Sequence, residues 1–242
     1  MTTSTDFAGF RPAAFTFLRS LRKHNEREWF ERNRVTYESE VRAPLAALAE
    51  EVDVRLATLA PEIVGDPKRS LFRIHRDVRF SNDKSPYKTH VACWFHHVDA
   101  GRGVGTQAAH GGAGFYFHME ATRASIGGGI WMPPRPALQK IREAIDEDAT
   151  PLKKILANAT IRRQFGGLAE ENMLSRMPRG YPMTHPAIEL LRHQSFTLGR
   201  ELAHKDLLVA RLPDVLAREY AKLLPLVRWI NHALGLRVLA RR

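Results

Sequence analysis

The segment FYFHMEATRASIGGGIW, Phe115–Trp131, decides the class of the fold. Its first part, Phe115–Glu120, alternates between apolar and polar side chains, which is the period of a β-strand with one packed face. Its second part, Ala124–Trp131, is a short apolar run that also predicts a strand. The connection between them is too short for a helical crossover, so the two strands should pair antiparallel. The segment therefore predicts a hairpin with one apolar and one polar face.

Two more strands are expected on the N-terminal side of this hairpin, at Leu71–Arg76 and Val91–Val98. Their connections are again too short for crossover helices. Phe196–Leu202 alternates in the same way and could add a further strand. The central sheet should therefore be mostly antiparallel.

Helical periodicity lies on both sides of these strands in the sequence. Apolar residues recur every three or four positions from Pro12 to Leu59, with Pro44 as the expected break or kink. The same spacing returns at 135–147, 151–158, 185–193 and 213–234. N-terminal helices, a central sheet and C-terminal helices predict an α+β fold, in which residues 1–242 form a single domain.

Composition bounds the class of protein. The chain of 242 residues is 44% hydrophobic, which is enough for one large core. It has no apolar run near the length of a membrane span, and its first residues lack the pattern of a secretory signal, so we expect a cytoplasmic protein without a membrane partner. The single cysteine, Cys93, excludes an internal disulfide and lies in an apolar run typical of a buried strand.

The formal charge of +11 comes mostly from the second half of the chain, where it is spread without a long basic run. Such a charge concentrates anionic partners near the surface without specifying one. Arginine outnumbers lysine, which can equally reflect the composition of the genome. A small anionic ligand is therefore a better-supported partner than nucleic acid, and the oligomeric state is not indicated.

Charge is densest in the motif Arg73–Tyr87, RIHRDVRFSNDKSPY. At the strand period of residues 72–80, one face carries the apolar side chains Phe72, Ile74, Val78 and Phe80. The other face carries Arg73, His75, Asp77 and Arg79. Arg76 breaks this pattern and must find a carboxylate or carbonyl partner, because an unpaired buried charge is costly. The stretch 81–88 contains turn-forming pairs and should be a loop.

Written as RxxRDxRFxxDKxxY, the motif resembles that of a family of bacterial and fungal proteins known as domain of unknown function 2461. Three further segments resemble the family in the same order, namely Phe15–Asn33, Gly114–Pro133 and Pro178–Pro186. The resemblance covers nearly the whole chain. It implies a single cytoplasmic domain with a shared site, and it implies neither a reaction nor a cofactor.

The motif offers side chains for binding an anion. Arginine makes planar bidentate contacts with carboxylate or phosphate, and lysine supplies a compact charge. The candidate ligand-binding residues are Arg73, Arg76, Arg79, Lys84, Tyr87 and Lys88. The alternative is an internal network that holds the loop. In it, Asp77 and Asp83 pair with Arg76, Arg79 and Lys84.

A second polar face could complete the site. If the motif and Phe115–Glu120 turn their polar faces the same way, the candidate acid–base residues meet. These are His75, Asp77, His118 and Glu120. Gly127–Gly129 would then leave a bare floor for a ligand, or would mark a bulge beneath a packed helix. The same residue types can bind metal, but the cations of the motif oppose a divalent ion, so no metal site is predicted.

Common nucleotide-binding and nucleophile motifs do not occur in the sequence. Gly101–Thr106 lacks the ending of a P-loop and is expected to be a flexible connection that could act as a lid. His96, His97 and His110 are weaker metal candidates. We predict a pocket for a small phosphorylated or carboxylated ligand, with enzymatic activity left open. The alternatives are a basic nucleic-acid-associated protein and a noncatalytic interaction domain whose motif is purely structural.

Overall fold

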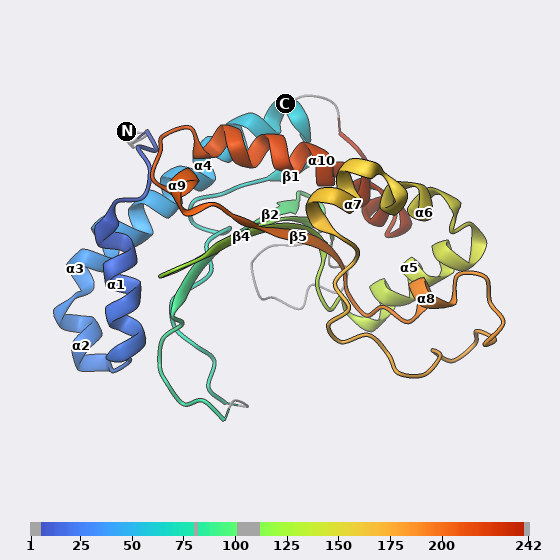
Figure 1. Ribbon diagram of the computed structural model, residues 1–242, viewed down its shortest axis with the longest axis horizontal. Helices are drawn as coiled ribbons and strands as arrows, with labels where there is room; N and C mark the ends of the chain where they lie inside the picture. Colours follow the sequence, from blue (N-terminus) through green and yellow to red (C-terminus); the bar gives the residue numbers. More distant parts are fainter. Residues whose placement is uncertain (1–5, 80–81, 101–111, 240–242) are drawn as a thin grey trace.

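The computed structural model describes residues 6–79, 82–100 and 112–239. Among these residues, a sheet of five strands follows the order of the chain, and each strand pairs antiparallel with the next (Figure 1). The strands are β1 (Ile63–Val64), β2 (His90–His97), β3 (Gly114–Glu120), β4 (Ala124–Ile130) and β5 (Phe196–Leu202). Helices precede and follow the sheet in the chain, so the expected α+β class is confirmed.

The residues before the sheet are helical, as expected. They form α1 (Pro12–Lys23), α2 (Arg27–Arg32), α3 (Arg34–Thr36), η1 (Tyr37–Arg42) and α4 (Ala43–Leu59). Pro44 does not end the helix, because the chain runs as a π-helix through η1 and continues directly into α4. The wider π-turn accommodates a proline ring, which has no N–H donor and conflicts with the carbonyl four residues earlier.

The residues after β4 form the remaining helices. They are α5 (Arg135–Glu147), α6 (Thr150–Ala157), α7 (Ala159–Phe165), α8 (Ile188–Leu191), α9 (His204–Leu207) and α10 (Leu212–Ala233). The helices expected at 135–147, 151–158 and 213–234 are confirmed, whereas 185–193 is helical only in α8. The spacing of apolar residues did not predict α7, which begins where the Asn158 side chain accepts hydrogen bonds from the backbone of Thr160 and Ile161.

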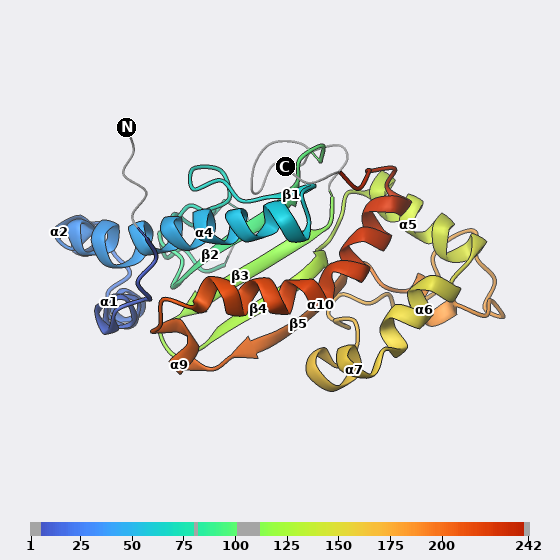
Figure 2. The ribbon, with the colours of Figure 1, turned by 90° about the horizontal axis from the view of Figure 1, so that it is seen from above.

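Helices α4 and α10 cover one face of the sheet (Figures 1 and 2). Phe115 of β3 stacks on Tyr220 of α10 with 4.6 Å between the ring centroids. Helix α10 approaches β4 so closely that a Cβ atom on Gly128 would lie 3.0 Å from the Leu223 side chain. Helices α1–α3 lie beyond one end of the sheet and α5–α8 beyond the other (Figure 1). The second face of the sheet points away from α4 and α10, and we call it the open face.

Candidate functional site

The charged motif forms a hairpin at the edge of the sheet. The residues just before it pair with β2, since Phe72 N donates to Ala92 O at 3.0 Å and Leu71 bridges Cys93. The chain then leaves β2, and His75 bridges Tyr87 across the hairpin. The strand expected at Leu71–Arg76 is therefore only two isolated bridges, because the segment changes its pairing partner midway.

Alternation within the motif is partly as expected. Ile74 is buried, whereas the four polar residues of the other face are exposed, namely Arg73, His75, Asp77 and Arg79. Phe72 does not join the packed face, because its ring meets the Tyr116 ring edge-on at 5.9 Å on the open face of the sheet. Phe80 lies outside the described residues.

Most cations of the motif bind partners within the hairpin itself. Arg76 donates to Asp83, and Arg79 Nη2 donates to Asp77 Oδ2 at 2.7 Å. The hydrogen bond from Arg79 lowers the pKa of Asp77 to about 2. Two lysines cap backbone carbonyls: Lys84 Nζ donates to Val78 O at 2.9 Å, and Lys88 Nζ donates to Arg73 O at 3.0 Å. The two arginine–aspartate pairs of the alternative network are therefore present in the structure, whereas Lys84 binds a carbonyl in place of a carboxylate.

Tyr87 joins the hairpin to the N-terminal helices. The sequence placed it on a loop as a candidate ligand-binding residue, but it is 2% exposed, and its ring stacks on Phe30 of α2 at 4.1 Å. His75 lies beside it, with 5.2 Å between the two rings. Asn25 completes the joint, because its side-chain amide donates to Tyr87 O at 2.9 Å and its Oδ1 accepts from Tyr87 N at 3.0 Å. The Asn25 side chain thus makes the two hydrogen bonds with the Tyr87 backbone that a neighbouring strand would otherwise make.

Asn25→Ala should loosen this hairpin without unfolding the protein. It leaves the backbone N–H and C=O of Tyr87 without partners in a half-buried place, which costs about 1–3 kcal/mol. We expect faster hydrogen exchange at Tyr87 and faster proteolysis within 73–88. Asn33→Ala, which removes only a local bond to Trp29 O, is the control. Unchanged exchange at Tyr87 in the Asn25 variant would contradict this role.

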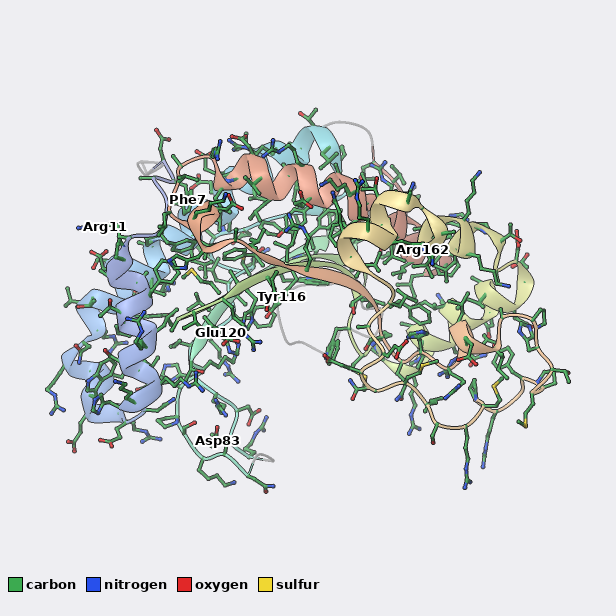
Figure 3. All side chains as sticks on the ribbon, viewed as in Figure 1. Phe7, Arg11, Asp83, Tyr116, Glu120 and Arg162 are labelled. Carbon is green, nitrogen blue, oxygen red and sulfur yellow. The ribbon has the colours of Figure 1, made fainter. Side chains whose placement is uncertain are left out.

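A second polar cluster lies on the open face of β3. The Tyr116 hydroxyl is 3.1 Å from His118 Nδ1, and His118 Nε2 is 3.1 Å from Glu120 Oε1. Arg123 Nη2 donates to the same carboxylate oxygen at 3.0 Å, and this bond lowers the pKa of Glu120. We call Tyr116, His118 and Glu120 the relay. Figure 3 shows Tyr116 and Glu120 on the side of the sheet that faces away from α4 and α10.

The partners of the relay set its protonation pattern. An ionised Glu120 only accepts hydrogen bonds, so a neutral His118 ring has its proton on Nε2, and its Nδ1 accepts from the Tyr116 hydroxyl. Burial raises the pKa of Tyr116 to about 12, which keeps the phenol protonated at neutral pH. The hydroxyl proton therefore points along the relay, and the oxygen lone pairs remain for another group.

The four expected acid–base residues do not form one cluster. His118 and Glu120 are hydrogen-bonded, whereas His75 packs against the Phe30 and Tyr87 rings. Within the described parts of the chain, neither His75 nor Asp77 makes a hydrogen bond or ring contact with the relay. The hairpin turns them toward α2 and Arg79 instead.

Sequence reasoning missed His90, whose ring stacks on His118 with 4.4 Å between centroids. Burial, together with the charges of His118 and Lys88, lowers the pKa of His90 to about 4. The alternation of β2 places His90 and Trp94 on one face, which was a usable signal. Only the register between β2 and β3, where His90 pairs with Glu120, brings His90 to the relay.

The pKa of His90 predicts a dependence of stability on pH. Unfolded chains bind a proton on histidine near pH 6.5, whereas folded His90 does so only near pH 4, so protonation favours unfolding. Stability should therefore fall between about pH 6.5 and pH 4, by about 1–2 kcal/mol after allowance for partial exposure. Urea denaturation at several pH values measures this loss. In the His90→Gln variant, the free energy of unfolding should fall less steeply with decreasing pH. Identical slopes of stability against pH in the two proteins would contradict this prediction.

A groove of about 880 Å³ lies over the relay on the open face. Aromatic side chains line it, namely Phe72, Trp94, Tyr116, Trp131 and Phe165. So do the carboxylates Glu120, Glu171 and Glu201. Backbone of Gly127–Gly129 also lines it. Gly127 leaves part of the groove floor bare, and a Cβ on Gly128 would point at α10, but the glycines form no bulge, because β4 pairs in continuous register with β3 and β5.

Other candidates from the sequence lie elsewhere. Cys93 is completely buried, and burial raises the pKa of its thiol. His97 Nε2 donates to Arg237 O at 2.9 Å, so that ring has a structural partner. Within the described residues, no three side chains among His, Cys, Asp and Glu are placed to hold a metal ion. The expected lid at Gly101–Thr106 and the candidate His110 lie outside the described residues.

A family model described as conserved hypothetical protein (DUF2461) matches residues 13–229. The chain belongs to this family. The match confirms the family that the motif and its accompanying segments resemble, and it includes the hairpin, the relay and most of α10. No curated protein and no solved structure matches the chain. None of the helices that the structure describes is long and apolar enough to cross a membrane.

Proposed function

We propose that this protein binds a small organic ligand in the groove over the open face of the sheet, and that the relay serves acid–base chemistry there. The observation that supports this most is a hydrogen-bonded Tyr116–His118–Glu120 series that faces a cavity of about 880 Å³. Concave sites of this size, with aromatic walls and polar groups that can orient a ligand, suit small molecules. The proposed ligand site is therefore the groove and not the neighbouring motif, most of whose cations bind within the hairpin.

The relay is suited to removing a proton from a bound ligand. A ligand O–H or N–H would donate to the Tyr116 oxygen, while the hydroxyl proton passes to His118 Nδ1. The imidazolium formed in this way keeps its Nε2–H on Glu120, whose negative charge stabilises it. Returning the protons along the same path makes the relay a general acid.

Long-range ¹H–¹⁵N correlation spectra test the relay itself. They should show His118 as the Nε2–H tautomer in the wild-type protein. Glu120→Gln should weaken that preference, because the amide can donate as well as accept. Tyr116→Phe should weaken it too, because it removes the hydroxyl beside His118 Nδ1. Tyr181→Phe, which changes a tyrosine outside the groove, is the control and should leave the tautomer unchanged. An Nδ1–H tautomer in the wild type would overturn the proposed path.

Binding is tested with a library of small fragments containing equal shares of cationic, neutral and anionic compounds, observed by ligand NMR. Ser125 is half-buried on the floor of the groove, so Ser125→Trp should fill it and abolish binding. Thr122→Trp is the matched control, because Thr122 is exposed in the turn between β3 and β4. Thr197→Trp on β5 replaces the first variant if that variant fails to fold. Fragments that bind all these proteins equally, or a library without binders, would overturn the proposal.

The other expectations from the sequence stay predictions. A cytoplasmic location is tested by cell fractionation. Association with nucleic acid predicts retention on DNA or RNA that falls steeply as salt rises, since phosphate contacts release counterions. A purely structural motif within a noncatalytic interaction domain predicts that no fragment binds in the groove.

A further inference from the structure

We propose that the groove selects an organic cation, an alkylammonium group held between aromatic faces and carboxylates. This inference rests on the proposed ligand site and names the class of ligand that the site takes. It differs from the phosphorylated or carboxylated ligand expected from the motif.

The charge of the groove supports a cation. Of its carboxylates, Glu120 is paired with Arg123. Glu171 and Glu201 are exposed and form no ion pair within the described parts of the chain, although Glu201 acts electrostatically on Arg123. Arg200 also borders the groove, but its Nε donates to Glu219 of α10 at 3.1 Å, on the other side of the sheet. The groove is thus locally acidic in a chain of formal charge +11.

The aromatic walls provide the second part of a cation site. Around Tyr116, the Phe72 ring lies at 5.9 Å and 90°, and the Trp94 ring lies at 6.5 Å and 53°. Rings inclined to one another in this way present faces and edges around a common space, and a cation is attracted to the face of each ring. A cation already packs against one of these rings, because Lys88 Nζ lies 5.4 Å from the centre of the Phe72 ring, although Lys88 itself does not line the groove.

Trp131 extends the aromatic surface at the rim, where its side chain is 52% exposed. The next residue, Met132, has a φ of 40°, an uncommon conformation for a residue with a side chain. Its N–H donates at 3.0 Å to the hydroxyl of Ser195, which is fully buried. A strained turn, fixed by this buried hydrogen bond, therefore keeps the large Trp131 indole in solvent beside the groove. Strain of this kind points to a role of the indole in binding a ligand.

Anions and neutral ligands fit this groove less well. A phosphate would meet Glu171 and Glu201 and would find Arg123 already paired. A neutral ring would stack on the same aromatic walls but would leave both carboxylates without a counter-charge. An alkylammonium group uses both features, because carboxylates and aromatic faces attract it together.

Choline and its uncharged isostere 3,3-dimethyl-1-butanol separate the effect of charge from that of shape. They differ only in that a carbon atom replaces the positively charged nitrogen of choline. We expect the wild-type protein to bind choline at least about tenfold more tightly by calorimetry, a preference of about 1.4 kcal/mol. Inorganic phosphate should not compete. Because the attraction is electrostatic, raising the salt concentration should weaken choline binding more than binding of the isostere.

The double variant Glu171→Gln, Glu201→Gln should clearly lower the choline preference, leaving only the part that the aromatic faces supply. The control is Glu170→Gln, an exposed neighbour that does not line the groove, and it should keep the preference. Equal binding of choline and its isostere by the wild type, or competition by phosphate, would overturn the cation inference. The proposed function would survive that outcome if neutral or anionic fragments still bind in a manner that Ser125→Trp blocks. A groove that binds no fragment would remove both.

Discussion

Arg228→Ala is expected to destabilise the protein by about 3 kcal/mol, because it leaves the carboxylate of Glu62 buried without its counter-charge. Glu62 is 1% exposed and precedes β1 directly. Arg228 of α10 donates to it twice, through Nε at 2.6 Å and Nη2 at 3.3 Å. The arginine side chain is 34% exposed, so water can enter the variant, and we place the loss at the low end of the range for buried pairs.

Urea denaturation measures this loss. The exposed pair Arg34–Glu31 supplies the control, because Arg34→Ala should cost less than about 1 kcal/mol. The double variant Glu62→Leu, Arg228→Met should regain much of the stability, since it removes both charges and keeps apolar volume. Neither residue lines the groove, so fragment binding should persist under native conditions. Equal losses for Arg228→Ala and Arg34→Ala would show that Glu62 does not need its partner.

Gly129→Ala is the second change with a large expected effect. Gly129 has a φ of 130°, and a Cβ atom there would lie 1.9 Å from the carbonyl oxygen of Phe196. Neither strand can yield without breaking the pairing of β4 with β5, so the variant should lose more than about 3 kcal/mol or fail to accumulate as folded protein. The same pairing places Thr197 beside the groove, so residual folded protein should also bind fragments more weakly.

Gly167→Ala is the matched control for this substitution. Gly167 also borders the groove, but a Cβ atom there would have no atom within 4 Å, and its backbone does not require glycine. We expect its stability to change by less than about 0.5 kcal/mol. Thermal melting followed by circular dichroism compares the two variants. Similar melting temperatures would mean that β4 and β5 tolerate a side chain at Gly129.

The sequence by itself determined the α+β class and the location of most elements. The alternation in β3, the apolar run in β4 and the helical spacing of α5 and α10 are patterns among residues close together in the chain. Backbone geometry alone therefore converts them into strands and helices. For the same reason, Tyr116, His118 and Glu120 were correctly placed on one polar face.

Only the tertiary structure decided which polar groups meet. The register of β2 on β3 brings the His90 ring to His118. The motif turns back on itself, so Tyr87 is buried against Phe30. For the same reason, two arginines of the motif bind carboxylates within the hairpin. Glu171 reaches the groove from a loop distant in sequence. Strand register and packing join residues far apart in the chain, and a one-residue shift would reverse each face, so local periodicity does not encode these contacts.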